Sequence, residues 1–453
     1  MAFACSSCGY RSVKWFGRCP SCGAWDSFAE AADGGTSTRE TESWLGEELR
    51  PITQIDLADV RRIPSGSDEL DRLLGGGLIP GGVILFGGEP GIGKSTLLLQ
   101  VAQTLAQAVG NVLYVSGEES ESQVKLRASR VGVEHERLYV LSEQSLERIA
   151  AAVEKLSPCA LMVDSIQTVV SGSIEGEAGS LRQLREASGE LIRLTKSKRL
   201  VTFLVGHITK DGAFAGPKSV EHLVDVALYL EGSRGEDLRF LRSVKNRFGA
   251  TDEAAVFRMT AEGMKEILNP SQFFLEGHHG EPRPGSVIVP ILEGTRPILV
   301  ELQALVSPTG GYGVLQRRCT GLDINRVLLL LAVIEKQLAV HIGGADVYLS
   351  VAGGLEARER ASDLAAVAAI VSSLRNRAID PKTVVVGEVG LSGEVRAVRR
   401  VAERVREAEK MGYERIVIPR VGAPSVGSAS AKGSIDVVPA ESIERALEEI
   451  GLA

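Results

Sequence analysis

The sequence lacks any long apolar run. Its hydrophobic stretches all fall short of the ~20 residues that a transmembrane helix needs. Cysteines also stand near the N-terminus, where a secretory signal peptide would carry an apolar core. These absences argue against a membrane protein and against a secreted one, and they predict a cytoplasmic location.

The chain also lacks an excess of positive charge. It has 51 lysine and arginine residues against 58 aspartate and glutamate residues, which gives a formal net charge of -7. The whole-chain charge therefore gives no support to nucleic-acid binding, although it says little about a local groove. No internal repeat occurs at solenoid periods. A length of 453 residues with 44% hydrophobic content predicts two or three globular domains.

Cysteine is scarce except at the N-terminus. Four of the six cysteines fall within the first 22 residues, as Cys5 with Cys8 and Cys19 with Cys22. Two-residue gaps let both thiolates of a pair reach one ion at ~2.3 Å, so the spacing predicts a tetrathiolate Zn²⁺ site. Metal would then supply the folding free energy of this short module, on the order of 10 kcal/mol. Disulfides are the alternative, but nothing in the sequence indicates secretion.

Changes in composition divide the chain into a cysteine module, a polar linker and two larger domains. The predicted parts are residues 1–30, 31–50, 51–270 and 271–453. The third part alternates apolar strand-like runs with helical patterns, which predicts a parallel β-sheet covered by helices on both faces. Asn269 and Pro270 break the chain before the last part. That part mixes strands with a strongly amphipathic helix over residues 363–377, so it predicts a second α/β domain.

A glycine-rich segment, GEPGIGKST, follows the apolar run Val83 to Phe86 and precedes a helical pattern. This is the context and spacing of a nucleotide-binding P-loop, whose backbone N–H groups surround a polyphosphate. In such a loop Lys94 reaches the β- and γ-phosphates and the Ser95 hydroxyl binds Mg²⁺. The sequence therefore predicts ATP binding by Gly88, Glu89, Pro90, Gly91, Ile92, Gly93, Lys94, Ser95 and Thr96.

Hydrolysis also needs an acid near Mg²⁺ and a base that orients water. Asp164 ends the apolar run from Ala160 to Val163, at the expected carboxyl edge of the sheet, and is predicted to hold Mg²⁺ with Ser95. Glu118 and Glu119 follow the strand-like run VLYVSG, one strand away. Glu118 is the predicted base, although either glutamate fits this position, and an acidic pair is also good helix capping.

These residues carry a family resemblance. The run from Ser65 to Thr96 resembles the RecA and KaiC class of P-loop ATPases, in which the catalytic glutamate follows the second strand as Glu118 does here. The cysteine module, the P-loop, VLYVSGEES, VDSIQT, GHITKDGAFAGPKSVEHLVD and KNRFG are together similar, in order and over essentially the whole chain, to the RadA (Sms) family of bacterial DNA-repair proteins. KNRFG, residues 245–249, is the most specific of these segments.

The KNRFG segment follows a predicted strand, LRFLRSV, at the far edge of the ATPase domain. A neighbouring subunit could present Lys245 or Arg247 there as a trans-acting cation that stabilises charge on the transferring phosphoryl group. A solvated turn that contacts nothing is the alternative. The resemblance favours the functional reading.

A local excess of positive charge stands between residues 178 and 218. Its eight basic residues outnumber three acidic ones. The predicted DNA-contacting residues are Lys210, Phe214, Lys218 and Arg247, since a glycine-rich basic loop with one aromatic residue can follow a phosphate backbone and stack a base. A solvated helix face over residues 181–198 is the competing account of the arginines. His207 either senses the nucleotide or is a packed polar residue.

Two segments, residues 346–379 and 383–419, resemble the proteolytic domain of Lon. Aligned on the shared helix, the Lon serine position falls on Ala361 and its lysine position on Ala402, while Ser362 is one residue away. Peptidase activity is therefore not expected, and the domain is predicted to be an assembly scaffold. A second hypothesis is that this domain has a DNA-facing surface formed by Arg396, Arg399, Arg400, Arg404 and Arg406. The glutamates interleaved with these arginines also fit a solvated helix.

Together these patterns predict an α/β protein with a RecA-like P-loop ATPase core, an N-terminal zinc module and an inactive Lon-protease-like C-terminal domain. The resemblance implies a hexameric, DNA-dependent ATPase that uses ATP, Mg²⁺ and Zn²⁺. Its expected partners are single-stranded DNA, branched recombination intermediates and a recombinase of the RecA type. The alternatives are a KaiC-like signalling ATPase and, less favoured, an ATP-dependent protease.

Overall fold

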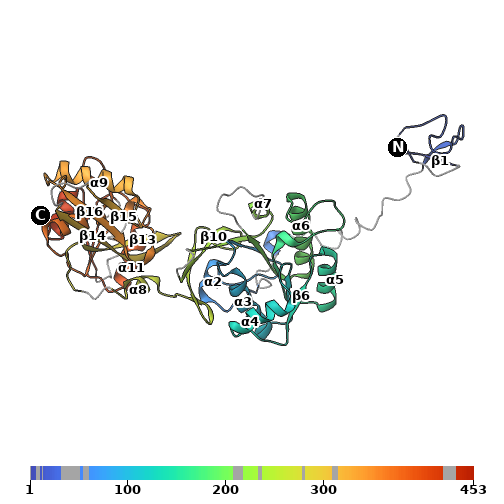
Figure 1. Ribbon diagram of the computed structural model, residues 1–453, viewed down its shortest axis with the longest axis horizontal. Coiled ribbons are helices and arrows are strands. Elements are labelled where there is room, and N and C mark those ends of the chain that lie inside the picture. Colours follow the sequence, from blue (N-terminus) through green and yellow to red (C-terminus); the bar gives the residue numbers. More distant parts are fainter. Residues whose placement is uncertain are drawn as a thin grey trace. The chain divides into compact units, whose positions relative to one another are not determined.

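The computed structural model describes residues 2–6, 11–12, 14–31, 51–54, 61–207, 218–232, 237–277, 281–308, 315–421 and 435–453. The chain forms two compact units, Met1–Val60 and Arg61–Ala453 (Figure 1). In the part of the chain just given, no helix is both long and apolar enough to cross a membrane.

The N-terminal unit is built around a small antiparallel sheet. Strand β1 (Ala2–Cys5) lies between β2 (Arg11–Ser12) and β3 (Phe28–Ala31). A short 3-10 helix, η1 (Ile52–Gln54), follows later in the same unit. The buried residues here are chiefly Cys5 and Cys19, against which Phe3 packs. So small a core makes a bound metal ion the expected source of stability.

The second unit begins with an α/β region whose described strands form one sheet in the order β12-β11-β10-β9-β4-β8-β7-β5-β6. The six strands from β9 to β6 in this order are parallel, and β10, β11 and β12 add an antiparallel extension. The strands are β4 (Val83–Gly88), β5 (Val112–Ser116), β6 (Leu138–Ser142), β7 (Ala160–Asp164), β8 (Val201–His207), β9 (Val226–Glu231), β10 (Leu238–Asn246), β11 (Ala254–Thr260) and β12 (Gly263–Glu266).

Helices cover both faces of the parallel part, as the sequence predicts. Ile84 and Phe86 of β4 pack with α2, α3 and α4, whereas Val83 and Leu85 of the same strand pack with α5 and α6. Successive residues of a strand point to opposite faces, so a fully buried strand needs an apolar side chain at every position. The helices are α2 (Asp68–Leu73), α3 (Lys94–Ala108), α4 (Glu121–Arg130), α5 (Leu146–Leu156), α6 (Leu181–Lys198) and α7 (Lys218–Glu221), with the 3-10 helix η3 (Ile166–Thr168).

The C-terminal region has a mixed sheet of its own, in the order β15-β16-β14-β13-β17-β20-β21. Its strands are β13 (Ser286–Glu293), β14 (Arg296–Pro308), β15 (Arg317–Thr320), β16 (Ala345–Val351), β17 (Thr383–Val385), β20 (Arg415–Pro419) and β21 (Asp436–Ala440). A separate hairpin joins β18 (Glu388–Val389) and β19 (Val395–Arg396). The helices are α8 (Pro270–Leu275), α9 (Ile324–Gln337), α10 (Asp363–Arg375), α11 (Val401–Lys410) and α13 (Ile443–Glu449), with the 3-10 helices η4 (Ala352–Gly354) and η5 (Arg360–Ser362).

Helix α10 is not amphipathic, and that prediction is wrong. Every residue from Asp363 to Ser372 is buried, because α10 packs against β13, β14, α9 and α13. Four alanines in this stretch are small enough to let these elements approach the helix closely. A helix that is enclosed on all sides has no polar face to maintain.

Candidate nucleotide-binding and catalytic site

The P-loop connects the end of β4 to the start of α3. Gly93 caps α3 with a φ of 117°, a left-handed conformation that favours glycine. A Cβ atom on Gly93 would also lie 2.5 Å from the Met259 side chain, and one on Gly88 would lie 2.6 Å from the Leu230 carbonyl oxygen. These glycines therefore let the loop curl tightly in front of the helix N-terminus, where an anion is favoured.

Lys94 lies within the loop that it serves. Its Nζ donates to the carbonyl oxygens of Gly88 at 2.8 Å and Glu89 at 2.9 Å, and the side chain is almost fully buried. Burial lowers the pKa of Lys94 to about 8, while the carboxylates of Asp164 and Glu118 act in the opposite direction. Phosphate oxygens would give this buried ammonium group the negative partner that it needs.

Ser95 and Asp164 form the pair that fits Mg²⁺. The Ser95 hydroxyl donates to Asp164 Oδ2 at 2.5 Å, across the gap between α3 and the end of β7. Hydroxyl and carboxylate oxygens are the hard ligands that Mg²⁺ prefers, and Mg²⁺ would neutralise the charge of a bound polyphosphate. The two residues predicted to hold the ion are thus in contact.

The two adjacent glutamates have different environments. Ser165, fully buried, donates its hydroxyl to Glu118 Oε1 at 2.7 Å, and the Glu118 side chain is 48% exposed toward the cavity beside Lys94. Glu119 instead pairs with the Arg127 guanidinium. Because a cation already neutralises Glu119, Glu118 is the better placed group to accept a proton from water.

His207 ends β8 and joins these groups. Its Nδ1 lies 3.1 Å from Lys94 Nζ, and its Nε2 lies 3.2 Å from Glu118 Oε1. Gln167 fixes the His207 backbone by donating to its carbonyl oxygen at 3.0 Å and accepting from its N–H at 3.2 Å. The imidazole therefore bridges the P-loop lysine and the predicted base.

A cavity of about 520 Å³ contains these side chains. Its lining includes Lys94, Ser95, Glu118, Asp164 and His207. It also includes residues that have no predicted role, namely Ser116, Arg127, Arg130, Val131, Met259, Thr260, Ala261 and Gly263. The two arginines lie in α4, whose sequence is typical of a solvent-exposed helix. Residues 259–263 belong to the antiparallel extension of the sheet, where β11 turns into β12. Only the folded sheet brings them to the nucleotide site.

Two further residues support the site from behind. Tyr114 of β5 is fully buried and donates its hydroxyl to Asp164 Oδ2 at 2.6 Å. Arg239 of β10 donates from Nε to the Ile92 carbonyl oxygen of the P-loop at 2.9 Å. A polar side chain within an otherwise apolar or β-forming run was the available signal for both.

The KNRFG segment is not at the edge of the sheet, because β11 and β12 lie beyond β10. Lys245 Nζ donates to the carbonyl oxygens of Glu221 at 2.8 Å and His222 at 3.0 Å, at the end of α7. Arg247 lies 3.4 Å from Asp225 Oδ1 while its side chain remains 57% exposed. Neither cation contacts the nucleotide cavity of its own chain, and Arg247 keeps enough exposed surface to reach a neighbour.

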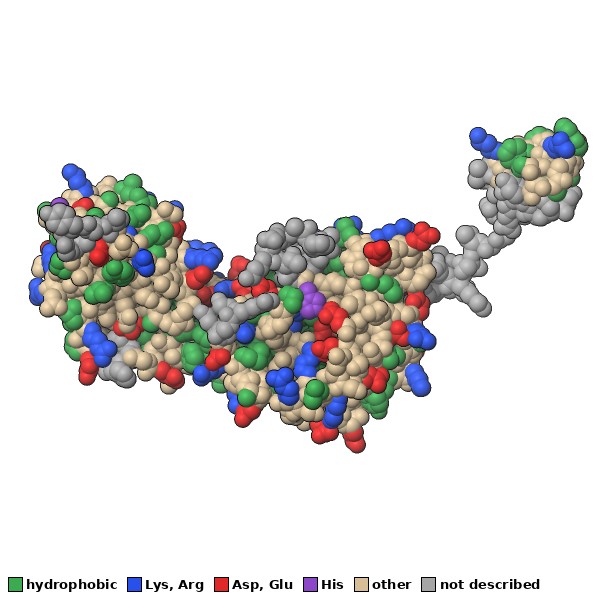
Figure 2. Space-filling view, viewed as in Figure 1, with side chains coloured by type: hydrophobic (Ala, Val, Ile, Leu, Met, Phe, Trp, Pro, Cys, Tyr) green, Lys and Arg blue, Asp and Glu red, His purple; other side chains and the backbone are tan. Residues whose placement is uncertain are grey.

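The predicted DNA-contacting residues are only partly within the described structure. Lys210 and Phe214 lie outside the described residues, and Lys218 is the first residue of α7. On α6, Arg193 pairs with Glu190, Lys198 with Glu154 at 2.7 Å and Lys196 with Asp225 at 2.8 Å. On the face shown in Figure 2, basic and acidic side chains are interspersed. The solvated-face account therefore fits these three residues of α6.

The positions that correspond to the Lon dyad are occupied by apolar packing. Ala361 belongs to a buried cluster against which Ala402 also packs. Ser362 is buried, and its hydroxyl donates to the Glu359 carbonyl oxygen at 2.8 Å. A serine nucleophile and a lysine base therefore do not meet at these two positions.

Arg404 cannot face DNA, so that part of the prediction is wrong. Its side chain is 0% exposed and lies 2.6 Å from Glu359. It also donates to the Pro290 carbonyl oxygen of β13. The sequence of a mostly polar helix predicts that its charged residues are exposed to solvent. Arg404 instead holds α11 against the sheet through a buried ion pair.

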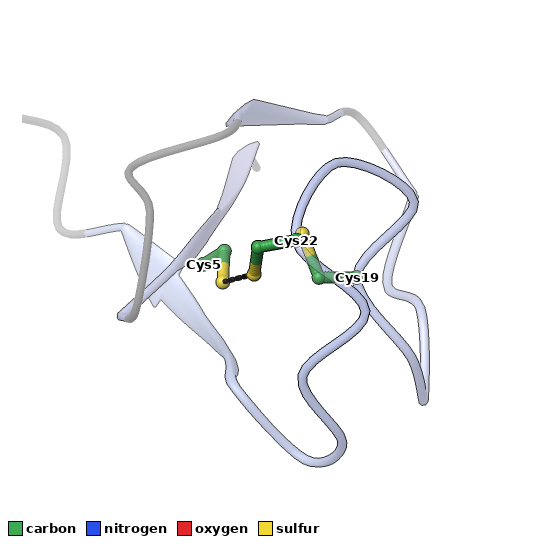
Figure 3. A group of neighbouring side chains, drawn as sticks. All are labelled: Cys5, Cys19 and Cys22. Atoms are coloured by element: carbon green, nitrogen blue, oxygen red, sulfur yellow. Dashed lines mark hydrogen bonds between the residues drawn. The ribbon is translucent and has the colours of Figure 1, made fainter.

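Three of the four predicted zinc ligands are brought together. The sulfur atoms of Cys5, Cys19 and Cys22 lie within 4.8 Å of one another, and those of Cys5 and Cys22 are 3.7 Å apart (Figure 3). Cys8 lies outside the described residues. A tetrahedral ion with ~2.3 Å Zn–S bonds separates its ligands by ~3.8 Å, whereas a disulfide needs ~2.05 Å. The spacing thus fits thiolates around one Zn²⁺ ion.

Known families match three segments of the chain. Residues 3–30 match the rubredoxin metal binding domain, residues 49–213 an AAA domain, and residues 345–421 the ChlI subunit of Mg-chelatase. These matches agree with the predicted zinc module, P-loop ATPase domain and Lon-like domain. The predicted α/β fold class is therefore confirmed, while the residue boundaries of the domains stay a prediction.

Full-length relatives are also similar. The DNA repair protein RadA of Bacillus subtilis is 46% identical over 450 residues, which cover 98% of this chain and 97% of that protein. The DNA repair proteins RadA of Halalkalibacterium halodurans and Listeria monocytogenes are 45% and 44% identical, with 98% and 99% of this chain covered and 97% of each relative. Among solved structures, a KaiC-like protein of Pyrococcus horikoshii aligns over 46% of this chain and 99% of its own at 20% identity, with a TM-score of 0.39.

Proposed function

The chain belongs to the RadA family of DNA repair proteins, and from this premise we propose that it is a DNA-dependent ATPase motor. It binds single-stranded DNA and promotes branch migration of recombination intermediates. The observation that carries this proposal is the assembly of Lys94, Ser95, Asp164 and Glu118 in one cavity of a chain similar throughout its length to DNA repair proteins. ATP and Mg²⁺ are the implied cofactors, with Zn²⁺ in the N-terminal module.

The chemistry follows from the positions of these side chains. The P-loop N–H groups and Lys94 bind the phosphates, while Ser95 and Asp164 would hold Mg²⁺, which would neutralise the developing negative charge. Glu118 orients the attacking water and accepts its proton. The Ser165 hydroxyl holds the Glu118 carboxylate in place. Hydrolysis breaks the bond between the β–γ bridging oxygen and the γ-phosphorus, and ADP and phosphate leave.

Coupling to DNA would run through the end of β8. His207 lies between Lys94 and Glu118, so loss of the γ-phosphate changes the charge beside it. The chain continues from His207 directly into residues 208–217, which include the predicted DNA contacts Lys210 and Phe214. A shift of His207 would thus reach the DNA-binding segment through one continuous stretch of backbone.

A homohexameric ring would complete each active site. Arg247, with its exposed side chain, and Lys245 are the cations that a neighbouring subunit would present to the γ-phosphate or to DNA. The branched substrates of such a motor are made by strand exchange, so a recombinase of the RecA type is the expected partner. The Lon-like domain then serves as an assembly scaffold.

The deciding experiment compares ATP hydrolysis with and without single-stranded DNA, together with displacement of a labelled strand from a three-stranded branch. Wild-type protein should hydrolyse ATP faster with DNA and displace the strand only with ATP. Lys94→Ala should do neither. If the rate of ATP hydrolysis is the same with and without DNA, the proposed motor function is wrong and a signalling ATPase is favoured.

A further inference from the structure

Tyr114 is a buried polar residue that the catalytic scheme above does not use. It lies in the middle of β5, directly opposite Met162 of β7, and Ser116 lies opposite Asp164 in the same register. Positions 114 and 116 face the same side of the sheet, as do positions 162 and 164. The Tyr114 side chain therefore lies on the same face as the Asp164 carboxylate, and its hydroxyl reaches Oδ2 at 2.6 Å.

The same carboxylate oxygen accepts a second hydroxyl. Ser95 Oγ donates to Asp164 Oδ2 at 2.5 Å, so two O–H donors from different elements meet on one atom. Tyr114 approaches from the sheet and Ser95 from α3. Two directional bonds of this kind restrict rotation of the carboxylate about its side-chain torsion.

From this geometry we propose that Tyr114 is a positioning residue for Mg²⁺, holding the Asp164 carboxylate in the orientation that the ion requires. The inference rests on the proposed ATPase function and adds a residue to it. Mg²⁺ demands near-ideal octahedral geometry, so a carboxylate that is free to rotate binds it less well. Residues behind a metal ligand commonly tune the affinity of the site in this way.

The hydroxyl, and not the ring, carries the effect. Tyr114 belongs to an apolar cluster with Ile84, Phe86 and Met162, where a phenylalanine ring would pack equally well. A phenol is protonated at neutral pH, so the Tyr114 hydroxyl donates to the Asp164 carboxylate. Tyr114→Phe therefore removes one hydrogen bond and little else.

The test measures nucleotide binding, with no need for turnover. The affinity of a fluorescent ADP analogue is measured in EDTA and then across a titration of free Mg²⁺. In Tyr114→Phe, affinity in EDTA should stay within about twofold of wild type, because P-loop contacts are intact. The Mg²⁺ concentration that gives half of the affinity gain should rise about tenfold, as expected for loss of a hydrogen bond to a charged acceptor.

Tyr229→Phe is the matched control. Tyr229 is also buried, on β9, and its hydroxyl also donates to a carboxylate, Glu221 Oε2, at 3.1 Å. The same chemical change there should leave the Mg²⁺ titration unchanged. In the double variant Tyr114→Phe with Asp164→Asn, the effect of Tyr114→Phe on the Mg²⁺ titration should disappear, since its partner is already altered.

The outcomes separate this inference from the proposed function. A wild-type Mg²⁺ titration in Tyr114→Phe would overturn the inference and leave the ATPase standing. If Tyr114→Phe lowers the affinity for the ADP analogue equally in EDTA and in Mg²⁺, the inference is also overturned, because that result indicates a general packing role. If Mg²⁺ fails to strengthen nucleotide binding by the wild-type chain, the nucleotide site itself is wrong.

Discussion

Lys94 Nζ and His207 Nδ1 lie 3.1 Å apart, which joins the P-loop to the end of the neighbouring strand β8. Gly88 and His207 are register partners in β4 and β8, so the sheet itself sets this approach. A cation next to imidazole disfavours a second positive charge. Burial lowers the pKa of His207 below its usual value, Lys94 lowers it further, and Glu118 and Asp164 oppose the shift.

The first prediction concerns the pH dependence of stability at His207. The unfolded chain takes up the imidazole proton near pH 6.5, and the folded chain does so only at lower pH. The unfolded state therefore binds more protons below about pH 6.5, and wild-type stability falls there relative to His207→Gln. Urea unfolding at pH 7.5 and 5.5, followed by circular dichroism, measures the free energy of unfolding of both proteins. The value for wild type minus the value for His207→Gln should be smaller at pH 5.5.

Circular dichroism is preferable because all three tryptophans lie within the first 44 residues and do not report on the ATPase region. In a Lys94→Met background the same comparison should give a weaker pH effect, since one of the causes is removed. If the free energy of unfolding of wild type relative to His207→Gln stays constant or increases toward pH 5.5, the pKa of His207 is not lowered in the folded chain.

The second prediction concerns Lys94 itself. Lys94→Ala should lower ATP hydrolysis at least about 100-fold, because the ammonium group stabilises charge that develops on the phosphates. Nucleotide affinity should also fall. Secondary structure should persist, as Lys94 packs in a loop whose shape also depends on glycines. Turnover near the wild-type rate in a folded variant would remove the P-loop argument.

The third prediction separates the two glutamates. Glu118→Gln should reduce kcat about 10² to 10⁴-fold with little change in KM, as expected for loss of a general base. Glu119→Gln should reduce kcat much less, because Glu119 is paired with Arg127. Steady-state kinetics of both variants tests this. The reverse order would assign water activation to Glu119.

Local sequence predicted the parts of this site that lie along one stretch of chain, and missed those that depend on packing. The strand before Gly88, the helix from Lys94 and the Asp164 position all follow from apolar runs and glycine spacing. Tyr114 was missed because the polar side chain in its apolar run does not identify a partner, and its contact with Asp164 depends on the pairing of β5 with β7. Arg404 was misassigned because its partner, Glu359, lies 45 residues away in the chain. The sequence pattern of α10 likewise did not indicate that strands and helices enclose it, among them β13, β14, α9 and α13.

The fourth prediction concerns the zinc module. Elemental analysis should find one Zn²⁺ per chain, and Cys5→Ser with Cys19→Ser should remove it, because both buried sulfurs belong to the cluster. Cys159→Ser is the control, since Cys159 packs against the ATPase core. Metal-free protein with intact disulfides would contradict the site.

The last prediction tests whether Arg247 acts across a subunit interface. Arg247→Ala should leave nucleotide binding and assembly intact, because its contact with Asp225 is long and its side chain is mostly exposed. If it serves a neighbouring site, hydrolysis should fall about 10³-fold and strand separation should be lost. Arg258→Ala is the matched control, as Arg258 is 52% exposed and lies 3.9 Å from Asp237, the residue that precedes β10.

Lys245→Ala tests a different link, because Lys245 also holds the end of α7 through the Glu221 and His222 carbonyl oxygens. Loss of those bonds frees the helix that follows residues 208–217, so this variant should uncouple hydrolysis from strand separation while keeping nucleotide affinity. Wild-type unwinding by both Lys245→Ala and Arg247→Ala would show that KNRFG is a surface turn.

Mixing Lys94→Ala with Arg247→Ala subunits decides between a trans and a cis role. Each variant alone lacks one half of every active site. In a mixed ring, an Arg247→Ala subunit supplies an intact P-loop, and a Lys94→Ala neighbour supplies an intact Arg247, so that interface is complete. Recovery of hydrolysis on mixing, greatest near equal proportions, is expected for a trans cation. If Arg247 served its own P-loop, no interface in the mixture would be complete, and hydrolysis would stay at the level of the separate variants.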